Sequence, residues 1–270
     1  MVDDHTAFIA SVPRAYDAYL GPILFEPFAQ DMADRLPPSP VENVLELACG
    51  TGRYSKWLRK NLPKDAKLVC SDLNPDMLTI AQEQMIGQDV EWKVVDMQAI
   101  SFPEQSFDLV TSQFGVMFPP DKPRAFAEVF RVLKPGGTFL FNTWDKIKYN
   151  GFTDVGNKVI LKFFPDIAPA FYESPFNLYD AIEVRELLEG AGFADVKITM
   201  VRKKAIAESV ANGAKGFTEG NPVYFAIMDR DPSLLPKIQA EIERALIESF
   251  GEHPMVSPLQ AWVFEAIRGL

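Results

Sequence analysis

Cysteine and histidine are scarce in this chain of 270 residues, since each occurs only twice. Cys49, Cys70, His5 and His253 do not have the spacing of a zinc site, and two cysteines are too few for the disulfide framework of a small secreted protein. We therefore expect no metal site. Both cysteines are expected to be small, buried apolar residues.

Long apolar runs and basic stretches are also lacking. No apolar run approaches the roughly 20 residues that a membrane-spanning helix needs, and the first residues are acidic rather than basic, unlike a secretory signal. Lys and Arg number 27 against 37 Asp and Glu, which gives a net charge of −10, and the densest basic run, Arg202–Lys204, is short. The absence of a secretory signal predicts a cytoplasmic protein. The charge balance favours a small-molecule partner over nucleic acid. We expect no membrane partner, and a monomer or a homodimer.

Strand-like and helix-like segments alternate between residues 41 and 144. Short apolar segments predict strands at 41–47, 67–72, 90–96, 106–113 and 134–144, and apolar residues at helical spacing predict helices at 53–62, 74–85 and 122–133. Asn74 and Pro75 are residue types typical of a helix start. Alternation of this kind predicts an α/β fold with a doubly wound, mostly parallel sheet.

The remaining segments are less regular and predict a helical cap formed by insertions. We expect an N-terminal helical segment at 1–40 and an α/β core at 41–147. Two cap insertions follow at 148–180 and 205–256, and the closing helix and strands of the core lie at 181–204 and 257–270. The N-terminal segment is amphipathic and aromatic.

The first predicted strand runs into a turn of small residues. Gly50 and Gly52 in this turn allow the backbone to bend tightly and to approach a ligand closely. Ligands of open parallel sheets bind beyond the carboxyl ends of the strands. The turn is therefore a candidate ligand site, although one Gly-x-Gly is also common in ordinary strand-to-helix turns.

Two acidic residues end the next two predicted strands. Asp72 could accept hydrogen bonds from a ribose diol, or cap the following helix instead. Asp96 could accept a hydrogen bond from an adenine amino group, while Met97 offers an apolar edge to the ring. Together with the glycine turn, these positions predict a site for an adenosine-type cofactor.

Two adenosine-type cofactors compete for this prediction. A nicotinamide dinucleotide fingerprint requires Gly-x-Gly-x-x-Gly, and Ser55 stands where the third glycine would be. Glu46, near the turn, is unfavourable beside phosphates but suits an ammonium or sulfonium charge. The residues thus favour a positively charged cofactor without a pyrophosphate.

The same segments resemble a known family. VLELACGTGRYS, Asp72, Asp96-Met97, FPEQSFDLVTSQFGVMFPPD and RVLKPGG are similar to the class I S-adenosylmethionine-dependent methyltransferases that act on small molecules, over about 41–145. The resemblance implies that S-adenosylmethionine is the cofactor. One departure is Ala48, which replaces the family's usual first glycine and predicts a slightly tighter turn.

The resemblance also implies roles for individual residues. The methionine end of the cofactor would be lined by Glu46, Ala48, Gly50 and Gly52, the ribose by Asp72, the adenine by Leu73, Asp96 and Met97, and the methyl-donor side by Gln113 and Phe114. In similar enzymes the N-terminal segment folds over the cofactor, so the resemblance makes Tyr16 and Tyr19 candidates to close the pocket, unless the segment packs against the sheet instead.

The resemblance further implies methyl transfer by in-line displacement to a small organic acceptor. Aromatic residues between Phe152 and Phe176 favour an acceptor that is largely apolar or aromatic, unless they form the core of the cap. No catalytic residue is identified. Asp145 and His253 are candidates for a base, although a solvated helix cap is the favoured interpretation of Asp145. Two alternative functions stay open, an NAD-dependent oxidoreductase and a non-catalytic S-adenosylmethionine-binding protein. The residues also do not show whether the methyl group would go to an O, N, C or S atom.

Overall fold

The chain forms two compact units that interleave along the sequence. The structure is a computed structural model that describes residues 11–38, 41–165 and 174–270. We call the first compact unit the helical unit; it comprises Met1–Pro27, Asp145–Asn177 and Arg202–Gln260. The second, the sheet unit, comprises Phe28–Trp144, Leu178–Val201 and Ala261–Leu270. Because each unit uses three stretches of chain, neither is a contiguous sequence domain.

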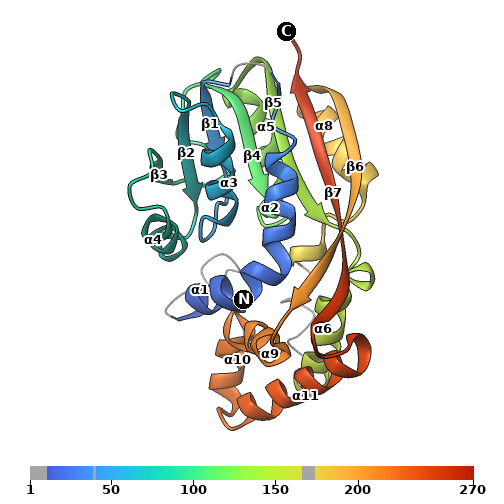
Figure 1. The fold of residues 1–270 in the computed structure, drawn as a ribbon. Coiled ribbons are helices and arrows are strands. Elements are labelled where there is room, and N and C mark those ends of the chain that lie inside the picture. Colours follow the sequence, from blue (N-terminus) through green and yellow to red (C-terminus); the bar gives the residue numbers. More distant parts are fainter. Residues whose placement is uncertain (1–10, 39–40, 166–173) are drawn as a thin grey trace. The chain divides into compact units, whose positions relative to one another are not determined.

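The sheet unit is built on seven strands. They are β1 (Asn43–Glu46), β2 (Lys67–Asp72), β3 (Glu91–Val94), β4 (Phe107–Gln113), β5 (Leu133–Trp144), β6 (Phe193–Ala207) and β7 (Met255–Arg268). The end of β6 from Arg202 and the start of β7 up to Gln260 belong to the helical unit. Their order in the sheet is β3-β2-β1-β4-β5-β7-β6 (Figure 1). The first five strands pair in parallel, whereas β7 is antiparallel to β5. The predicted doubly wound, mostly parallel sheet is therefore confirmed.

Helices cover both faces of this sheet. The helices of the sheet unit are α2 (Glu26–Ala33), α3 (Arg53–Asn61), α4 (Pro75–Gln84), α5 (Lys122–Val132) and α8 (Ala181–Gly190), of which α2 starts in the helical unit. Tyr54 of α3 contacts Thr111 of β4, and Thr111 is in register with Leu140. Phe126 of α5 contacts Phe139, the neighbour of Leu140 in β5. Because successive side chains of a strand point to opposite faces, α3 and α5 lie on opposite sides of the sheet.

Aromatic side chains fill much of the core on the α5 side. The rings of Phe141 and Phe264 stack at 4.8 Å, and Phe126 meets the ring of Phe141 edge-on at 5.7 Å. All three side chains are fully buried. Their contacts join β5, β7 and α5 in one buried cluster.

The helical unit packs its helices through glycines. Its helices are α1 (Val12–Ala15), the π-helix η2 (Tyr16–Phe25), η3 (Ile147–Tyr149), α6 (Gly151–Phe163), η4 (Ser174–Phe176), α9 (Val210–Glu219), α10 (Val223–Arg230) and α11 (Leu234–Phe250). The rings of Phe152 and Phe217 lie 4.7 Å apart. A Cβ on Gly156 would approach the Phe217 ring to 2.4 Å, so the close packing of α6 on α9 depends on that glycine.

The predicted elements between residues 41 and 144 all form, with ends that differ by a few residues. Asn74 is the N-cap of α4, because its side chain accepts hydrogen bonds from the backbone N–H of Asp76 and Met77. Among the aromatic residues expected to line a cap, Phe152 and Phe164 are fully buried, Phe163 and Phe176 are half-buried, and Phe171 and Tyr172 lie outside the described residues.

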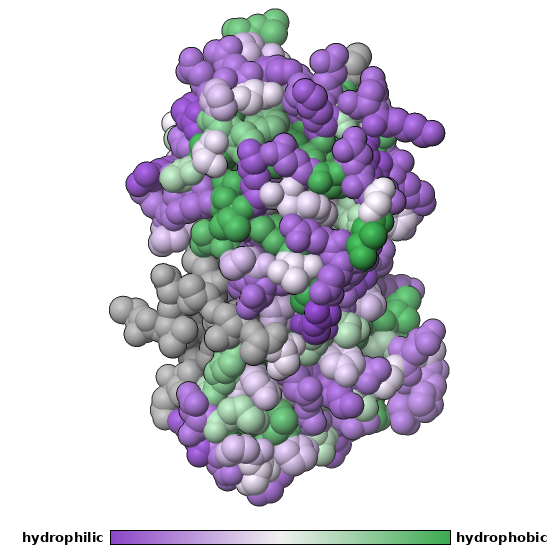
Figure 2. Space-filling view, turned by 90° about the vertical axis from the view of Figure 1, so that its left-hand side faces the viewer, coloured by the Kyte–Doolittle hydropathy of each residue, from purple (hydrophilic) through white to green (hydrophobic). Residues whose placement is uncertain are grey.

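Hydrophilic residues predominate on the face shown in Figure 2, and hydrophobic residues form small patches between them. Exposed large hydrophobic side chains of the sheet unit include Leu73, Ile86 and Val94. In the described part of the chain, no helix has the length and apolar content that crossing a membrane requires.

Candidate functional site

The carboxyl ends of four neighbouring strands lie at one edge of the sheet unit. Glu46, the last residue of β1, is in register with Cys70 of β2 on one side and Thr111 of β4 on the other. Asp72, the last residue of β2, is in register with Val94 of β3. The segments that follow β1, β2, β3 and β4 therefore meet at a common edge, where the sequence predicts the ligand.

Three residues of the turn after β1 have left-handed backbone conformations. Ala48, Gly50 and Gly52 have φ angles of 53°, 56° and 83°. A Cβ on Gly50 would have no atom within 4 Å, whereas a Cβ on Gly52 would lie 3.0 Å from the Cβ of Ala81 in α4. Gly52 thus permits close packing on α4, and Gly50 leaves open space above the turn.

Asp72 joins this turn to β2. One oxygen of its carboxylate accepts the backbone N–H of Gly50 at 2.8 Å, and the other accepts that of Asn74 at 2.9 Å. A carboxylate oxygen can accept more than one hydrogen bond, so Asp72 can hold the turn and also accept from a ligand hydroxyl. The next residue, Leu73, is 43% exposed and offers an apolar side chain beside this carboxylate.

Glu46 is buried in a pocket of neutral groups. The hydroxyl of Ser55 and the thiol of Cys70 both donate to its Oε2, at 2.5 and 3.1 Å. Its Oε1 is buried and has no hydrogen-bond partner among the described residues. Burial raises the pKa of Glu46 from 4.5 to about 7, and the charge of Asp72 adds to this, against the lowering effect of the two hydrogen bonds.

The segment after β3 carries Asp96, Met97 and Gln98. The backbone N–H of Gln98 donates to Oδ1 of Asp96 at 2.8 Å. Asp96 is half-buried, and Met97 is only 7% exposed. A carboxylate and a thioether thus lie one residue apart at the sheet edge, where β2 and β3 end.

Aromatic rings gather where β4 and β5 end. Phe114 follows β4 with a φ of 52°, and its backbone N–H donates to Oδ1 of the buried Asn142 at 2.8 Å. Its ring stacks on Trp144, the last residue of β5, at 3.7 Å, and Phe28 meets both rings edge-on at 5.3 Å. The left-handed conformation of Phe114 is uncommon for a bulky residue and is held here by hydrogen bonding and stacking. Gln113, just before it, is half-buried.

Four further candidate residues belong to the helical unit. Tyr16 and Tyr19 are half-buried in η2, where Tyr16 contacts Phe25 at 5.0 Å and Tyr19 lies under the ammonium of Lys215 at 5.9 Å. The Asp145 carboxylate accepts from Gln260 Nε2 at 2.5 Å and from the backbone N–H of Lys146 at 2.6 Å. His253 is highly exposed, 3.4 Å from Glu252. The proposed roles of these residues at a cofactor or acceptor stay predictions.

Three residues of this edge escaped the sequence analysis as site residues. Ser55 donates to Glu46, Gln98 to Asp96, and Asn142 accepts from Phe114. Ser55 had been noted only as a missing glycine. Gln98 carries a detectable signal, since it follows Asp96 by two residues, whereas nothing local in the sequence relates Asn142 to Phe114.

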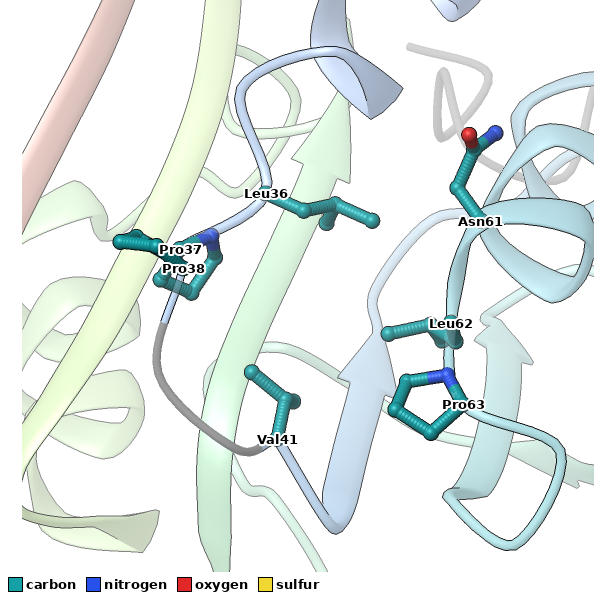
Figure 3. A pocket seen from close by; sticks show the side chains of 7 residues that line it. All are labelled: Leu36, Pro37, Pro38, Val41, Asn61, Leu62 and Pro63. Atoms are coloured by element: carbon teal, nitrogen blue, oxygen red, sulfur yellow. The ribbon is translucent and has the colours of Figure 1, made fainter.

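A cavity of about 300 Å³ in the sheet unit lies away from this edge (Figure 3). It is lined by Leu36, Pro37, Pro38, Val41, Asn61, Leu62 and Pro63. These residues precede β1 and β2, so the cavity is at the amino ends of the strands. Within the described ranges, no group of three or more His, Cys, Asp or Glu residues is arranged to hold a metal ion.

Comparison with known proteins finds a methyltransferase domain over the strands that end at this edge. A methyltransferase domain model matches residues 44–137. The ubiquinone/menaquinone biosynthesis C-methyltransferase UbiE of Hydrogenovibrio crunogenus is 32% identical over 112 residues, which are 40% of this chain and 44% of that protein. The chain thus spans about half the length, or less, of the curated relatives it matches.

Solved structures share the fold at low sequence identity. The Haemonchus contortus phosphoethanolamine N-methyltransferase 2, in complex with S-adenosyl-L-methionine, has a TM-score of 0.62 and 15% identity over 99% of this chain and 59% of its own. The [4+2]-cyclase SpnF has a TM-score of 0.55 and 17% identity over 91% of this chain and 81% of its own. These likenesses concern the fold alone, since proteins of different activity share it. Residues 44–137 are thus a methyltransferase domain of the class I S-adenosylmethionine-dependent type.

Proposed function

We propose that this protein transfers a methyl group from S-adenosylmethionine to a small organic acceptor that is largely apolar or aromatic. The observation that carries the proposal is the common edge at which the glycine turn, Asp72 and Asp96 follow three adjacent strands. The curated relatives are C-methyltransferases by name, which supports the same reaction class.

The residues of the edge fit this donor in chemistry and in space. The open space above Gly50 leaves room for the methionine end, and the unpartnered Oε1 of Glu46 provides an acceptor for an ammonium group. Asp72 would bind the ribose hydroxyls and Asp96 the amino group of adenine. Met97 and the exposed Leu73 would contact the two faces of the base.

The chemistry places modest demands on the protein. S-adenosylmethionine supplies a methyl group on a positively charged sulfur, which departs as a neutral thioether when an acceptor atom displaces it in line. Residues near the sulfur need to position the acceptor and exclude water. Phe114 and Trp144, stacked at the ends of β4 and β5, are the described apolar groups suited to this task beside an apolar acceptor. A base is required only where the acceptor must lose a proton.

Cofactor binding tests the first half of the proposal. Isothermal titration with S-adenosylhomocysteine should give binding, whereas NAD should give none. In Asp72→Ala the affinity for S-adenosylhomocysteine should fall about 10- to 100-fold, which corresponds to the ~1–3 kcal/mol of hydrogen bonds to a charged group. Asp89→Ala, which removes an exposed carboxylate of the same unit, is the matched control and should bind like the wild type. Tight NAD binding without a response to S-adenosylhomocysteine would refute the proposal in favour of an oxidoreductase.

Turnover tests the second half. The protein is incubated with S-adenosylmethionine and a library of small quinols, phenols, amines and carboxylic acids, and the release of S-adenosylhomocysteine is measured. We expect release with aromatic members of the library. Cofactor binding without turnover on any of them would favour a non-catalytic S-adenosylmethionine-binding protein.

A further inference from the structure

Gln98 connects the carboxylate of Asp96 to helix α5. The backbone N–H and the side-chain Nε2 of Gln98 both donate to Oδ1 of Asp96, at 2.8 and 3.4 Å. At its other end, the side-chain Oε1 of Gln98 accepts the backbone N–H of Asp121 at 2.9 Å. Asp121 is the N-cap of α5, since its carboxylate accepts the backbone N–H of Arg124.

A stripe of side chains on α5 holds the rest of this segment. Arg124 donates to the backbone carbonyl of Gln98 at 2.8 Å. One turn later, Glu128 accepts the backbone N–H of Ile100 at 2.8 Å, and Arg131 donates to the carbonyl of Ile100, also at 2.8 Å. Residues 124, 128 and 131 share one face of a helix, because they are spaced by four and three positions.

The opposite face of α5 is fixed to the sheet. Phe126, Val129 and Val132 are fully buried, and the ring of Phe126 contacts β5. The segment after β3 is therefore attached along its length to a helix that cannot easily move. Through Gln98 this attachment reaches the carboxylate of Asp96, and both hydrogen bonds from Gln98 end on the same oxygen, Oδ1.

We propose that Gln98 is a positioning residue that sets the base specificity of the cofactor site. By holding Oδ1 of Asp96 against α5, it presents Oδ2 as the acceptor for the exocyclic amino group of a purine. The inference rests on the proposed function, since it takes the ligand to be an adenosine derivative. It assigns to Gln98 the discrimination between an amino group and an oxygen at that position of the base.

The test compares two ligands that differ in the exocyclic group at this position and in the proton on the adjacent ring nitrogen, which only the inosyl base carries. S-adenosylhomocysteine carries the amino group, and S-inosylhomocysteine carries an oxygen in its place. We expect the wild type to prefer the first by at least tenfold in isothermal titration, because the inosyl base would leave an acceptor facing an acceptor. In Gln98→Met, which has a similar size but lacks the polar groups, the ratio of the two affinities should fall at least fivefold. Gln98→Asn, whose amide is one methylene too short for both partners, should give the same loss and is a second variant if the first folds poorly.

Two further variants separate this inference from general damage. Gln82→Ala removes an exposed glutamine of α4 and should keep the wild-type ratio. Asp96→Asn should abolish the preference for S-adenosylhomocysteine. In the Asp96→Asn background, an added substitution of Gln98 should then leave the ratio of the two affinities unchanged. If Gln98 has only a structural role, its substitution should lower the affinity for both ligands equally and leave the ratio of the two affinities unchanged.

The possible results separate the role of Gln98 from the proposed function. An unchanged ratio in both Gln98 variants, with S-adenosylhomocysteine still bound, overturns the role of Gln98 and leaves the proposed function standing. An equal affinity of the wild type for the two ligands also overturns it. Failure of the wild type to bind S-adenosylhomocysteine overturns the proposed function and this inference together.

Discussion

Glu46 is a carboxyl group in surroundings that offer hydrogen bonds but no positive charge. Ser55 and Cys70 donate to it as neutral groups, and the charge of Asp72, which also acts on it, is negative. Ionised Glu46 is therefore costly in the protein without a ligand. A ligand with a cationic end would offset that cost.

A pH-dependent stability follows from Glu46. Its pKa is about 7 in the folded protein and 4.5 when exposed. Below pH 4.5 both states hold the proton. Between pH 4.5 and 7 the unfolded chain releases it while the folded protein keeps it, so the free energy of unfolding falls as the pH rises, by about 3 kcal/mol in total. Glu46→Gln removes this titration, and the stability difference between variant and wild type should shift by that amount across the window in urea unfolding. Stability curves that stay parallel from pH 4.5 to 7 would contradict the prediction.

Ala48 carries backbone strain that glycine would relieve. Its φ of 53° lies in the left-handed region, which costs an L-residue roughly 1–2 kcal/mol, while glycine adds about 0.4–1 kcal/mol of conformational entropy to the unfolded state. Ala48→Gly should therefore stabilise the protein by about 0.5–1 kcal/mol. Ala127→Gly, at an exposed position of α5, should instead destabilise it by about 1 kcal/mol. Thermal unfolding of both variants checks the opposite signs, and a loss of stability in both would argue against strain at Ala48.

At the scale of elements, the segment between β3 and β4 takes its shape from α5. Arg131 donates to the carbonyl groups of Ile100 and Phe102 at 2.8 and 2.9 Å and also to Glu128. The guanidinium can make these bonds together because its donors diverge in one plane. The sequence of the segment alone does not contain this information.

Arg131→Lys tests this dependence, since it keeps the charge and loses the planar donors. We expect the free energy of unfolding to fall by about 1–2 kcal/mol, as for the loss of two hydrogen bonds. Arg185→Lys is the control, because Arg185 on α8 makes an exposed ion pair with Glu189 at 3.6 Å, a kind of pair that contributes little. If the denaturation midpoints of the two variants change by the same amount, the carbonyl contacts of Arg131 do not stabilise the fold.

The elements of the sheet were predictable from sequence because their limits are marked locally. Asn74 and Pro75 begin α4, and a glycine turn follows β1. The contacts that orient the acidic residues were not predictable in the same way. Ser55 reaches Glu46 from α3, and Asn142 reaches Phe114 from β5, so each pair meets only once the sheet has formed. The π-helix η2, with Pro22 inside it, likewise had no local signal that we recognised.

At the scale of the whole molecule, the family resemblance ends before the sheet does. The methyltransferase domain match covers residues 44–137, whereas β7 lies between β5 and β6 and comes from the last part of the chain. The sheet unit thus needs residues that are more than one hundred positions beyond its core motifs. A segment chosen from the match alone would leave β5 without its antiparallel neighbour.

Removal of residues 261–270 should therefore prevent folding of the sheet unit. This segment supplies the residues of β7 that pair with β5 from Thr138 to Trp144, and its Phe264 is fully buried against Phe141. Loss of a buried phenylalanine side chain alone costs about 3–5 kcal/mol, and a domain is stable by only about 5–15 kcal/mol. The shortened chain should lose the cooperative thermal transition and be cut rapidly by trypsin.

A shorter truncation provides the control. Gly269 and Leu270 are exposed and follow Arg268, whose guanidinium donates to the backbone carbonyl groups of Phe130, Arg131 and Leu133 where α5 ends. A chain that ends at Arg268 keeps these bonds and the whole of β7, so it should unfold close to the wild-type temperature. If the chain that ends at residue 260 also unfolded cooperatively near that temperature, β7 would be an accessory strand, and the core motifs would suffice for the fold. Because β7 brings the fully buried Ala261, Phe264 and Ala266 to the side of β5, we expect the two truncations to differ sharply.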